Sequence, residues 1–232
     1  MGFPWLNERV AEIRGEIAGA IRRGGHGQEV RLIAVTKTHG PEAVLAAAAA
    51  GIHDVGENKV QEALSKQEAL RAAGTMPAGL TWHLIGHLQT NKVKALPQFR
   101  LFHALDRAKL ADEAAAMAAK LGVTLDVLVQ VNVAGEDTKG GYVPAALASE
   151  AERLRGLPNL RVRGVMTMAP FDAPESVLRA VFRGAREARD VLRAAGHPAD
   201  ELSMGMSGDY LIAVEEGATL VRLGTILFGT RH

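Results

Sequence analysis

Short runs of β-branched and aliphatic residues recur along the chain and alternate with longer segments whose apolar residues have helical spacing. The runs typical of strands are 31–36, 52–55, 81–85, 101–104, 125–133, 160–167, 201–204 and 219–223. The helical segments are rich in Ala, Glu, Lys and Arg, and each has a Pro or Gly near its end, as in 41–50, 107–121 and 174–195. A further helix over 5–22 precedes the first run.

Strands that alternate with helices favour parallel pairing, because each parallel strand needs a long return connection. Eight such units in 232 residues predict an α/β protein of the (β/α)₈ TIM-barrel type, whose usual length is roughly 250 residues. An open doubly wound sheet is the alternative, but the first strand is not followed by a GxGxxG turn. Because no linker, repeat or low-complexity tract interrupts the pattern, we expect residues 1–232 to form a single domain.

Composition narrows the classes of function. The net charge of +1 gives no electrostatic reason to expect nucleic acid or an acidic membrane as a partner. The absence of cysteine excludes disulfides, zinc-thiolate sites and a thiol nucleophile. The N-terminus lacks a signal-type apolar core, and the longest apolar run, 43–52, is shorter than the roughly 20 residues of a membrane span. We therefore expect a cytoplasmic protein. We also expect a monomer.

Polar residues and glycines follow several predicted strands. In a parallel barrel the loops at the carboxyl ends of the strands converge on one mouth, where the chemistry takes place. The relevant segments are 35–39, 56–59, 82–89, 165–168, 203–208 and 222–225. Their number favours a ligand site at this mouth.

Lys37 directly follows 32–35, a segment that should be fully buried. A lysine there has a large desolvation cost, unless its alkyl chain reaches water or its charge is paired or lost. Burial lowers the pKa of a lysine, and the neutral amine is the form that attacks an aldehyde. Lys37 is therefore a candidate for Schiff-base formation, and a surface lysine just past the strand end is the alternative.

Ser207, Gly224 and Thr225 follow the last two predicted strands, where barrels of this class commonly bind phosphate. Ser207 opens the helical segment 210–216, so it is a candidate N-cap whose hydroxyl could face an anion. Gly224 permits a close backbone approach, and Thr225 adds a hydroxyl. A helix cap and a strand terminator without a ligand are the alternatives, but a glycine with a hydroxyl residue at both adjacent strand ends favours phosphate.

Three further positions have more than one interpretation. Arg222 lies in a run that should be buried, so it needs a partner, either a ring nitrogen of a cofactor or a carboxylate such as Glu201. His83 and His87 are four apart, a spacing that brings side chains together only on a helix, so we expect no metal site. Met166, two residues before another methionine, is either core filler or an apolar wall beside a ring.

Several stretches of the sequence, taken together, resemble the pyridoxal 5'-phosphate (PLP) homeostasis protein family. The stretches are 34–37, 56–62, 82–92, 164–168, 202–207 and 221–229, and they cover essentially the whole chain in order. The family has the barrel fold of the N-terminal half of alanine racemase, which is fold type III among PLP proteins. Two stretches depart from the family pattern, 103–107 and 135–141, the second of which keeps the spacing of Glu136 and Lys139.

The resemblance implies PLP as the cofactor and a role for each matching residue. Lys37 would form the Schiff base, Asn58 and His83 would line the cofactor pocket, and Met166 would pack near the ring. The other positions would be the phosphate ligands Ser207, Gly224 and Thr225, and Arg222 at the pyridine nitrogen.

These assignments favour a PLP carrier over an efficient enzyme. An arginine is a poor proton donor to the ring nitrogen, so the electron sink would be weak. We also expect the chain to lack the second domain from which alanine racemase draws a catalytic base. The resemblance implies a protein that buffers PLP or delivers it to apo PLP enzymes and influences amino-acid and keto-acid pools. A low-activity amino-acid racemase, and a barrel enzyme that acts on a phosphorylated sugar through Lys37, are the alternatives.

Overall fold

The computed structural model describes residues 2–136 and 138–229, in which eight parallel strands close into a barrel in chain order. The strands are β1 (Arg31–Val35), β2 (Asp54–Glu57), β3 (Thr81–Leu84), β4 (Leu101–Leu105), β5 (Leu125–Gln130), β6 (Leu160–Met166), β7 (Glu201–Ser203) and β8 (Leu220–Leu223). Strand β8 closes the barrel by pairing with β1, where Ile33 lies opposite Arg222. The predicted (β/α)₈ barrel is confirmed.

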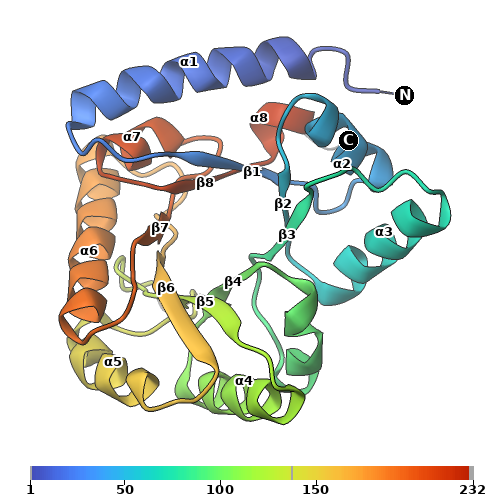
Figure 1. The fold of residues 1–232 in the computed structure, drawn as a ribbon. Coiled ribbons are helices and arrows are strands. Elements are labelled where there is room, and N and C mark those ends of the chain that lie inside the picture. The colour runs from blue at the N-terminus through green and yellow to red at the C-terminus, as the bar shows by residue number, and fades with distance from the viewer. Residues whose placement is uncertain (1, 137, 230–232) are drawn as a thin grey trace.

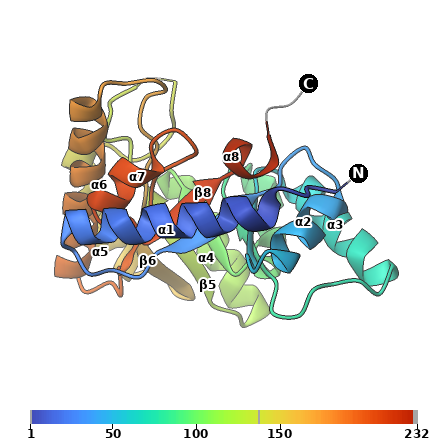
Figure 2. The same cartoon turned by 90° about the horizontal axis from the view of Figure 1, so that it is seen from above.

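Helices surround the barrel (Figure 1). They are α1 (Leu6–Gly24), α2 (Pro41–Ala49), α3 (Val60–Ala72), α4 (Ala108–Leu121), α5 (Leu147–Arg155), α6 (Glu175–Ala194), α7 (Tyr210–Glu215) and α8 (Thr225–Phe228), with 3₁₀ segments η1 (Thr90–Gln98) and η2 (Pro144–Ala146). Helix α1 lies against α7 and α8 on the outside of the barrel, as the two views show (Figures 1 and 2). None of these helices is long and apolar enough to cross a membrane.

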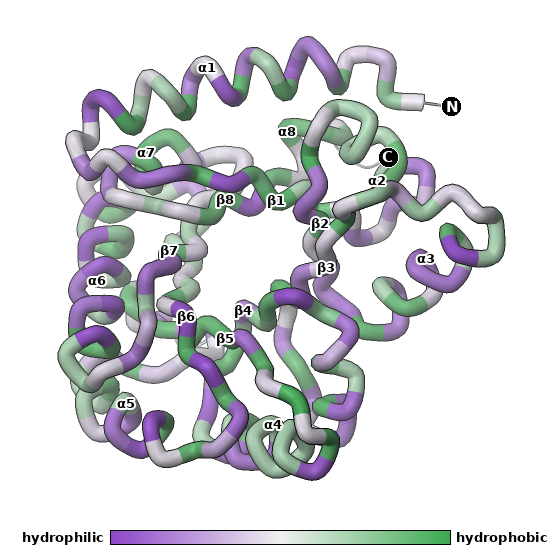
Figure 3. The backbone as a smooth tube through the Cα atoms, in the orientation of Figure 1, coloured by the Kyte–Doolittle hydropathy of each residue, from purple (hydrophilic) through white to green (hydrophobic). Residues whose placement is uncertain are grey.

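The hydrophobic periodicity explains how the long helices pack. In α6 the buried residues include Leu178, Phe182 and Ala185, which recur every three or four positions and therefore share one face. Hydrophobic and hydrophilic positions accordingly alternate along α6 and α1 in Figure 3. The apolar face of α6 packs against β6 and β7.

Strand β2 begins two residues later than the predicted run 52–55, because Ile52 belongs to the end of helix α2. The backbone N–H of Ile52 donates to Ala47 O at 2.9 Å, and that of Gly51 donates to Ala48 O at 2.9 Å. With Gly51 at φ +76°, this is the pattern of a Schellman motif, in which a hydrophobic residue follows the glycine. The shift places Asn58 immediately after the strand.

Strand β5 ends at Gln130, three residues before the end of the predicted run 125–133. The chain turns there because Asn132 Nδ2 donates to Glu136 O at 2.9 Å and to Lys139 O at 3.0 Å. The other predicted strands and helices agree with the structure to within two residues. The turn after β5 forms a loop at the carboxyl end of the barrel.

Candidate functional site

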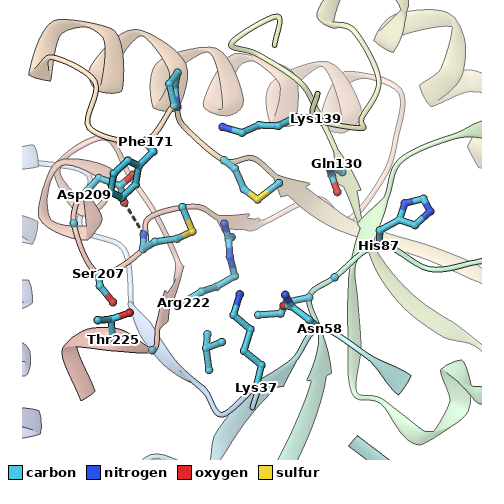
Figure 4. Close-up of a pocket in the computed structure, with 18 of the residues that line it drawn as sticks. Lys37, Asn58, His87, Gln130, Lys139, Phe171, Ser207, Asp209, Arg222 and Thr225 are labelled. Atoms are coloured by element: carbon cyan, nitrogen blue, oxygen red, sulfur yellow. Dashed lines mark hydrogen bonds between the residues drawn. The ribbon is translucent and has the colours of Figure 1, made fainter. Parts of the chain in front are cut away.

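A cavity of about 710 Å³ opens at the carboxyl ends of the strands, and its volume lies in the usual range for small-molecule sites. Residues that follow β1, β2, β3, β6, β7 and β8 form its wall, together with the loop after β5 (Figure 4). The sequence-predicted residues on this wall are Lys37, Asn58, Ser207, Arg222, Gly224 and Thr225. The barrel thus brings most of the predicted site into one space.

Lys37 lies between two anchored neighbours at the end of β1. The backbone N–H of Thr36 donates to Gly56 O at 3.2 Å. Thr38 has φ +66°, a left-handed conformation that is uncommon for a β-branched residue, and its N–H is held by the carboxylate of Glu62. The half-buried Lys37 side chain points into the cavity (Figure 4).

A buried ionic cluster behind Lys37 fixes this turn. Lys66 Nζ donates to Thr36 O at 2.7 Å, to Glu57 Oε1 at 2.6 Å and to Glu62 Oε1 at 2.9 Å. The hydroxyl of Thr36 also donates to Glu57 Oε1. Lys66 and Glu57 are 5% and 0% exposed. Desolvation raises the pKa of Glu57, although the hydrogen bonds from Lys66 and Thr36 oppose the shift.

Sequence reasoning missed this cluster. Glu57 lies in the segment 56–59 that was noted at a strand end, and Lys66 is four residues after Glu62, a spacing that brings helical side chains together. The contact between Lys66 and Glu57 depends on how helix α3 packs against β2, which the sequence pattern does not specify.

The candidate phosphate residues lie together on one side of the cavity, where Ser207 and Thr225 are neighbours (Figure 4). Ser207 was expected to cap the helix that begins at Tyr210, but Asp209 occupies that N-cap position. Asp209 Oδ1 accepts a hydrogen bond from Met206 N at 2.6 Å. The hydroxyl of Ser207 instead accepts from Ile226 N at 3.2 Å, so it joins the turn after β7 to the helix after β8.

Arg222 lies inside the barrel and its guanidinium reaches the floor of the cavity. It is 5% exposed, and it donates to Ser203 Oγ at 2.6 Å and to Thr167 O at 3.0 Å. The alternative partner Glu201 is bound to Arg31 instead, at 2.5 Å. Burial lowers the pKa of Arg222 to about 10, so the side chain still carries a positive charge at neutral pH.

Two predicted residues do not lie on the wall of the cavity. His83 is 0% exposed and faces the barrel interior, where its ring contacts His103 and Asp54. Met166 is 1% exposed, and Met168, two residues later, lines the cavity in its place. His83 lies within β3 and Met166 is the last residue of β6, whereas Met168 follows the end of that strand.

His83 and His87 lie in different surroundings. His83 Nε2 is 2.8 Å from Asp54 Oδ1, whereas His87 Nδ1 is 2.7 Å from Asp106 Oδ2. The two rings therefore contact different carboxylates. Within residues 2–136 and 138–229 no group of three or more His, Asp or Glu side chains is placed to hold a metal ion.

The structure adds cavity residues that the sequence did not assign. Gln130 and Phe171 line the cavity, and Phe171 is 95% exposed. Lys139 also lines it, and its Nζ pairs with Glu136 and donates to Ala169 O at 2.9 Å. Residue 137, between the two members of this pair, lies outside the described residues. The retained Glu136 and Lys139 spacing was the available signal for this loop.

Comparison with known proteins gives consistent results. Residues 18–232 match the family model of the alanine racemase N-terminal domain. The chain is 46% identical to the pyridoxal phosphate homeostasis protein of Aquifex aeolicus, with 97% of both chains covered. It is 41% identical to the protein of the same name from Pseudomonas aeruginosa, over 97% of this chain and 96% of that one.

Solved structures extend the likeness. PipY of Synechococcus elongatus, in a structure with PLP bound, is 37% identical, with a TM-score of 0.83 over 97% of this chain and all of that one. Alanine racemase of Corynebacterium glutamicum shares the fold at 15% identity, with a TM-score of 0.74 over this whole chain and 62% of that one. The sequence motifs, the closed barrel and these relatives together show that the chain belongs to the pyridoxal phosphate homeostasis protein family, with the fold of the alanine racemase N-terminal domain.

Proposed function

We propose that this chain binds PLP as a Schiff base on Lys37 and acts as a reservoir that buffers the cofactor or delivers it to apo PLP enzymes. The observation that carries this proposal is the convergence of Lys37, Arg222 and the pair Ser207 and Thr225 on one cavity. The PLP-bound structure of the relative PipY supports it. We further propose that the protein works as a monomer in the cytoplasm.

The residues present fit the parts of the cofactor. An amine for the aldehyde, a buried guanidinium for the ring nitrogen, and two hydroxyls for the phosphate line the same space (Figure 4). Asn58 and Met168 complete a mixed polar and apolar wall of the kind that small-molecule sites have.

Lys37 supplies the covalent bond. Its Nζ, in the neutral form, attacks the aldehyde carbon, a carbon–nitrogen double bond forms, and the aldehyde oxygen leaves as water. The reaction is reversible, so bound cofactor is kept away from other amines and can still be released. The clamped turn from Thr36 to Thr38 holds this amine in a constant position.

Arg222 favours storage over turnover. When bound, PLP supplies an electron sink, and the strength of that sink depends on protonation of the ring nitrogen. A guanidinium with a pKa of about 10 keeps its proton at neutral pH and donates a hydrogen bond instead. The site is therefore poorly suited to stabilise a carbanion, and efficient racemase activity is not expected.

The test is to incubate the purified protein with PLP, record its absorption spectrum, reduce it with borohydride and identify the modified peptide. We expect a yellow protein with a phosphopyridoxyl group on Lys37. A label on another residue would contradict the proposal, and a colourless protein would favour the sugar-phosphate enzyme. Incubation with single L-amino acids tests the racemase alternative, because rapid formation of the D-isomer would show an enzyme.

Replacing Ser207 and Thr225 together by alanine should weaken PLP binding by about a hundredfold to ten-thousandfold, because two hydrogen bonds to a charged group are lost and each contributes about 1.5–3 kcal/mol. The colour should return at high cofactor concentration, since Lys37 is intact. Spectral titration measures the dissociation constant. The double variant Thr75→Ala, Ser149→Ala removes two exposed hydroxyls outside the cavity and should bind as the parent does. Unchanged affinity in the cavity variant would remove these residues from the phosphate site.

A further inference from the structure

A series of hydrogen-bonded polar side chains, all buried except Asp54, crosses the barrel interior from the start of β2 to the cavity. Asp54 Oδ1 is 2.8 Å from His83 Nε2, and His83 Nδ1 is 3.0 Å from His103 Nε2. His103 Nδ1 is 2.8 Å from Ser203 Oγ, which is 2.6 Å from Arg222 Nη1. The residues come from β2, β3, β4, β7 and β8.

Because these side chains are buried, the loss of any one of their hydrogen bonds would be costly in free energy. His83, His103 and Ser203 are all 0% exposed, and Arg222 is 5% exposed. A polar atom that loses its partner in such a place keeps the full penalty of desolvation. The two histidine rings meet edge to face, with centroids 5.2 Å apart. The interior of this barrel therefore carries a polar connection in place of the usual aliphatic layers.

Arg222 at one end and Asp54 at the other limit the directions of the hydrogen bonds between them. Arg222 can only donate, so the Ser203 hydroxyl accepts from it and is free to donate to His103 Nδ1. At the other end the Asp54 carboxylate is an acceptor. Partial burial alone would raise the pKa of Asp54, but hydrogen bonds from His83 and Thr81 lower it. His83 must therefore carry its hydrogen on Nε2.

Only one hydrogen fits between the two rings. His83 uses Nε2 to donate to Asp54, and in the arrangement where the Ser203 hydroxyl donates, His103 accepts on Nδ1. With both rings neutral, the remaining hydrogen lies on His103 Nε2 and is donated to His83 Nδ1. Complete burial holds the pKa of His103 well below its ordinary value, which agrees with a neutral ring. All donors then point the same way, from Arg222 to Asp54.

We propose that His83 and His103 are positioning residues, which act through Ser203 to hold the Arg222 guanidinium at the point where the ring nitrogen of PLP is expected. This inference rests on the proposed function, because it concerns the contact between Arg222 and PLP. His103 fixes the rotation of the Ser203 hydroxyl, and that hydroxyl together with Thr167 O restrains the guanidinium. Without the histidines Ser203 can turn, and Arg222 loses one of its two restraints.

The first test uses the full-length protein without PLP and with ¹⁵N-labelled histidine. Long-range ¹H–¹⁵N correlation spectra report which ring nitrogen of each histidine carries hydrogen, and the variants His83→Gln and His103→Gln assign the signals. We expect the Nε2–H tautomer for both His83 and His103 at neutral pH. An Nδ1–H tautomer or a charged ring at either position would show that the hydrogen bonds do not all run from Arg222 to Asp54.

The second test compares PLP binding in His103→Leu, His103→Gln and His197→Leu. His103→Leu should weaken binding by about tenfold and shift the absorption band of the bound cofactor, because Arg222 is no longer held. His103→Gln should restore most of both properties, since an amide has an acceptor and a donor side by side. His197 is also buried, but it donates to Ala151 O at 2.8 Å and has no contact with the series from Asp54 to Arg222. His197→Leu should therefore leave the absorption band unchanged.

Circular dichroism identifies a variant that fails to fold. If His103→Leu does so, Ser203→Ala takes its place, since it removes only the oxygen that joins Arg222 to His103. A folded His103→Leu or Ser203→Ala variant with the parent's affinity and spectrum would overturn the inference. Failure of the parent to form a borohydride-stable adduct on Lys37 would overturn the proposed function instead, and the tautomers would still decide whether the chain is directed as described.

Discussion

Lys37→Ala should abolish borohydride-stable attachment of PLP, from about one equivalent per chain in the parent to none. The Lys37 amine forms the covalent bond in the proposed site, whereas the Lys139 amine pairs with Glu136 and donates to Ala169 O. Mass spectrometry of the reduced protein measures the attachment directly. Reversible binding should persist at higher PLP concentrations, because Arg222, Ser207 and Thr225 still line the cavity.

The matched control is Lys139→Ala, which removes another amine from the wall of the same cavity. This variant should keep the adduct on Lys37. If reduction of the Lys37→Ala protein labelled Lys139 to the parent's extent, the attachment would depend on proximity to the cavity and not on the position of Lys37. The proposed division of roles between the two lysines would then be wrong.

Lys66→Met should have the largest effect on stability, a loss of about 3–5 kcal/mol in the free energy of unfolding, as found when one partner of a buried ion pair is removed. The change leaves the Glu57 carboxylate, which is 0% exposed, without its cation. Urea unfolding measures the loss. Lys109→Met, at an exposed position of helix α4, should change stability by less than about 0.5 kcal/mol. A Lys66→Met protein as stable as the parent would show that the cluster adds nothing to stability.

The pH dependence of this variant has a definite sign. Burial raises the pKa of Glu57 above its ordinary value of 4.5, so the folded state binds a proton more readily than the unfolded state does. Stability from such a group is fully present below the unfolded pKa and is lost as the pH rises through the folded pKa. Without Lys66 the folded pKa rises further, so the deficit of the variant should shrink as the pH falls towards 4.5.

The sequence predicted the barrel and most of the cavity wall for identifiable reasons. Lys37, Ser207 and Thr225 were found because the carboxyl ends of parallel strands always meet, whatever the details of packing. The start of β2 was misplaced because Ile52 has strand propensity but serves as the hydrophobic residue of a helix terminus. Local hydrogen bonding there overrides the propensity.

The hydrogen-bonded series of side chains from Asp54 to Arg222 could not be predicted, because it depends on the registers of strands that are distant in sequence. His103 lies 100 residues from Ser203, and only the closed barrel places one opposite the other. The resemblance implies that His83 lines the cofactor pocket, but its side chain contacts Asp54 and His103 inside the barrel. A periodicity of two shows that neighbouring side chains alternate, but it does not show which of them faces inward.

Strand β8 pairs with β1, and this pairing has a consequence for synthesis on the ribosome. Lys37 is translated early, whereas Gly224 and Thr225 are added nearly 190 positions later. A growing polypeptide therefore exposes the reactive amine long before the turn that would grip the anionic end of the ligand has emerged from the exit tunnel. Loading must wait until β8 and the residues after it have joined the barrel, and a product of premature termination would present an unprotected amine without a pocket around it.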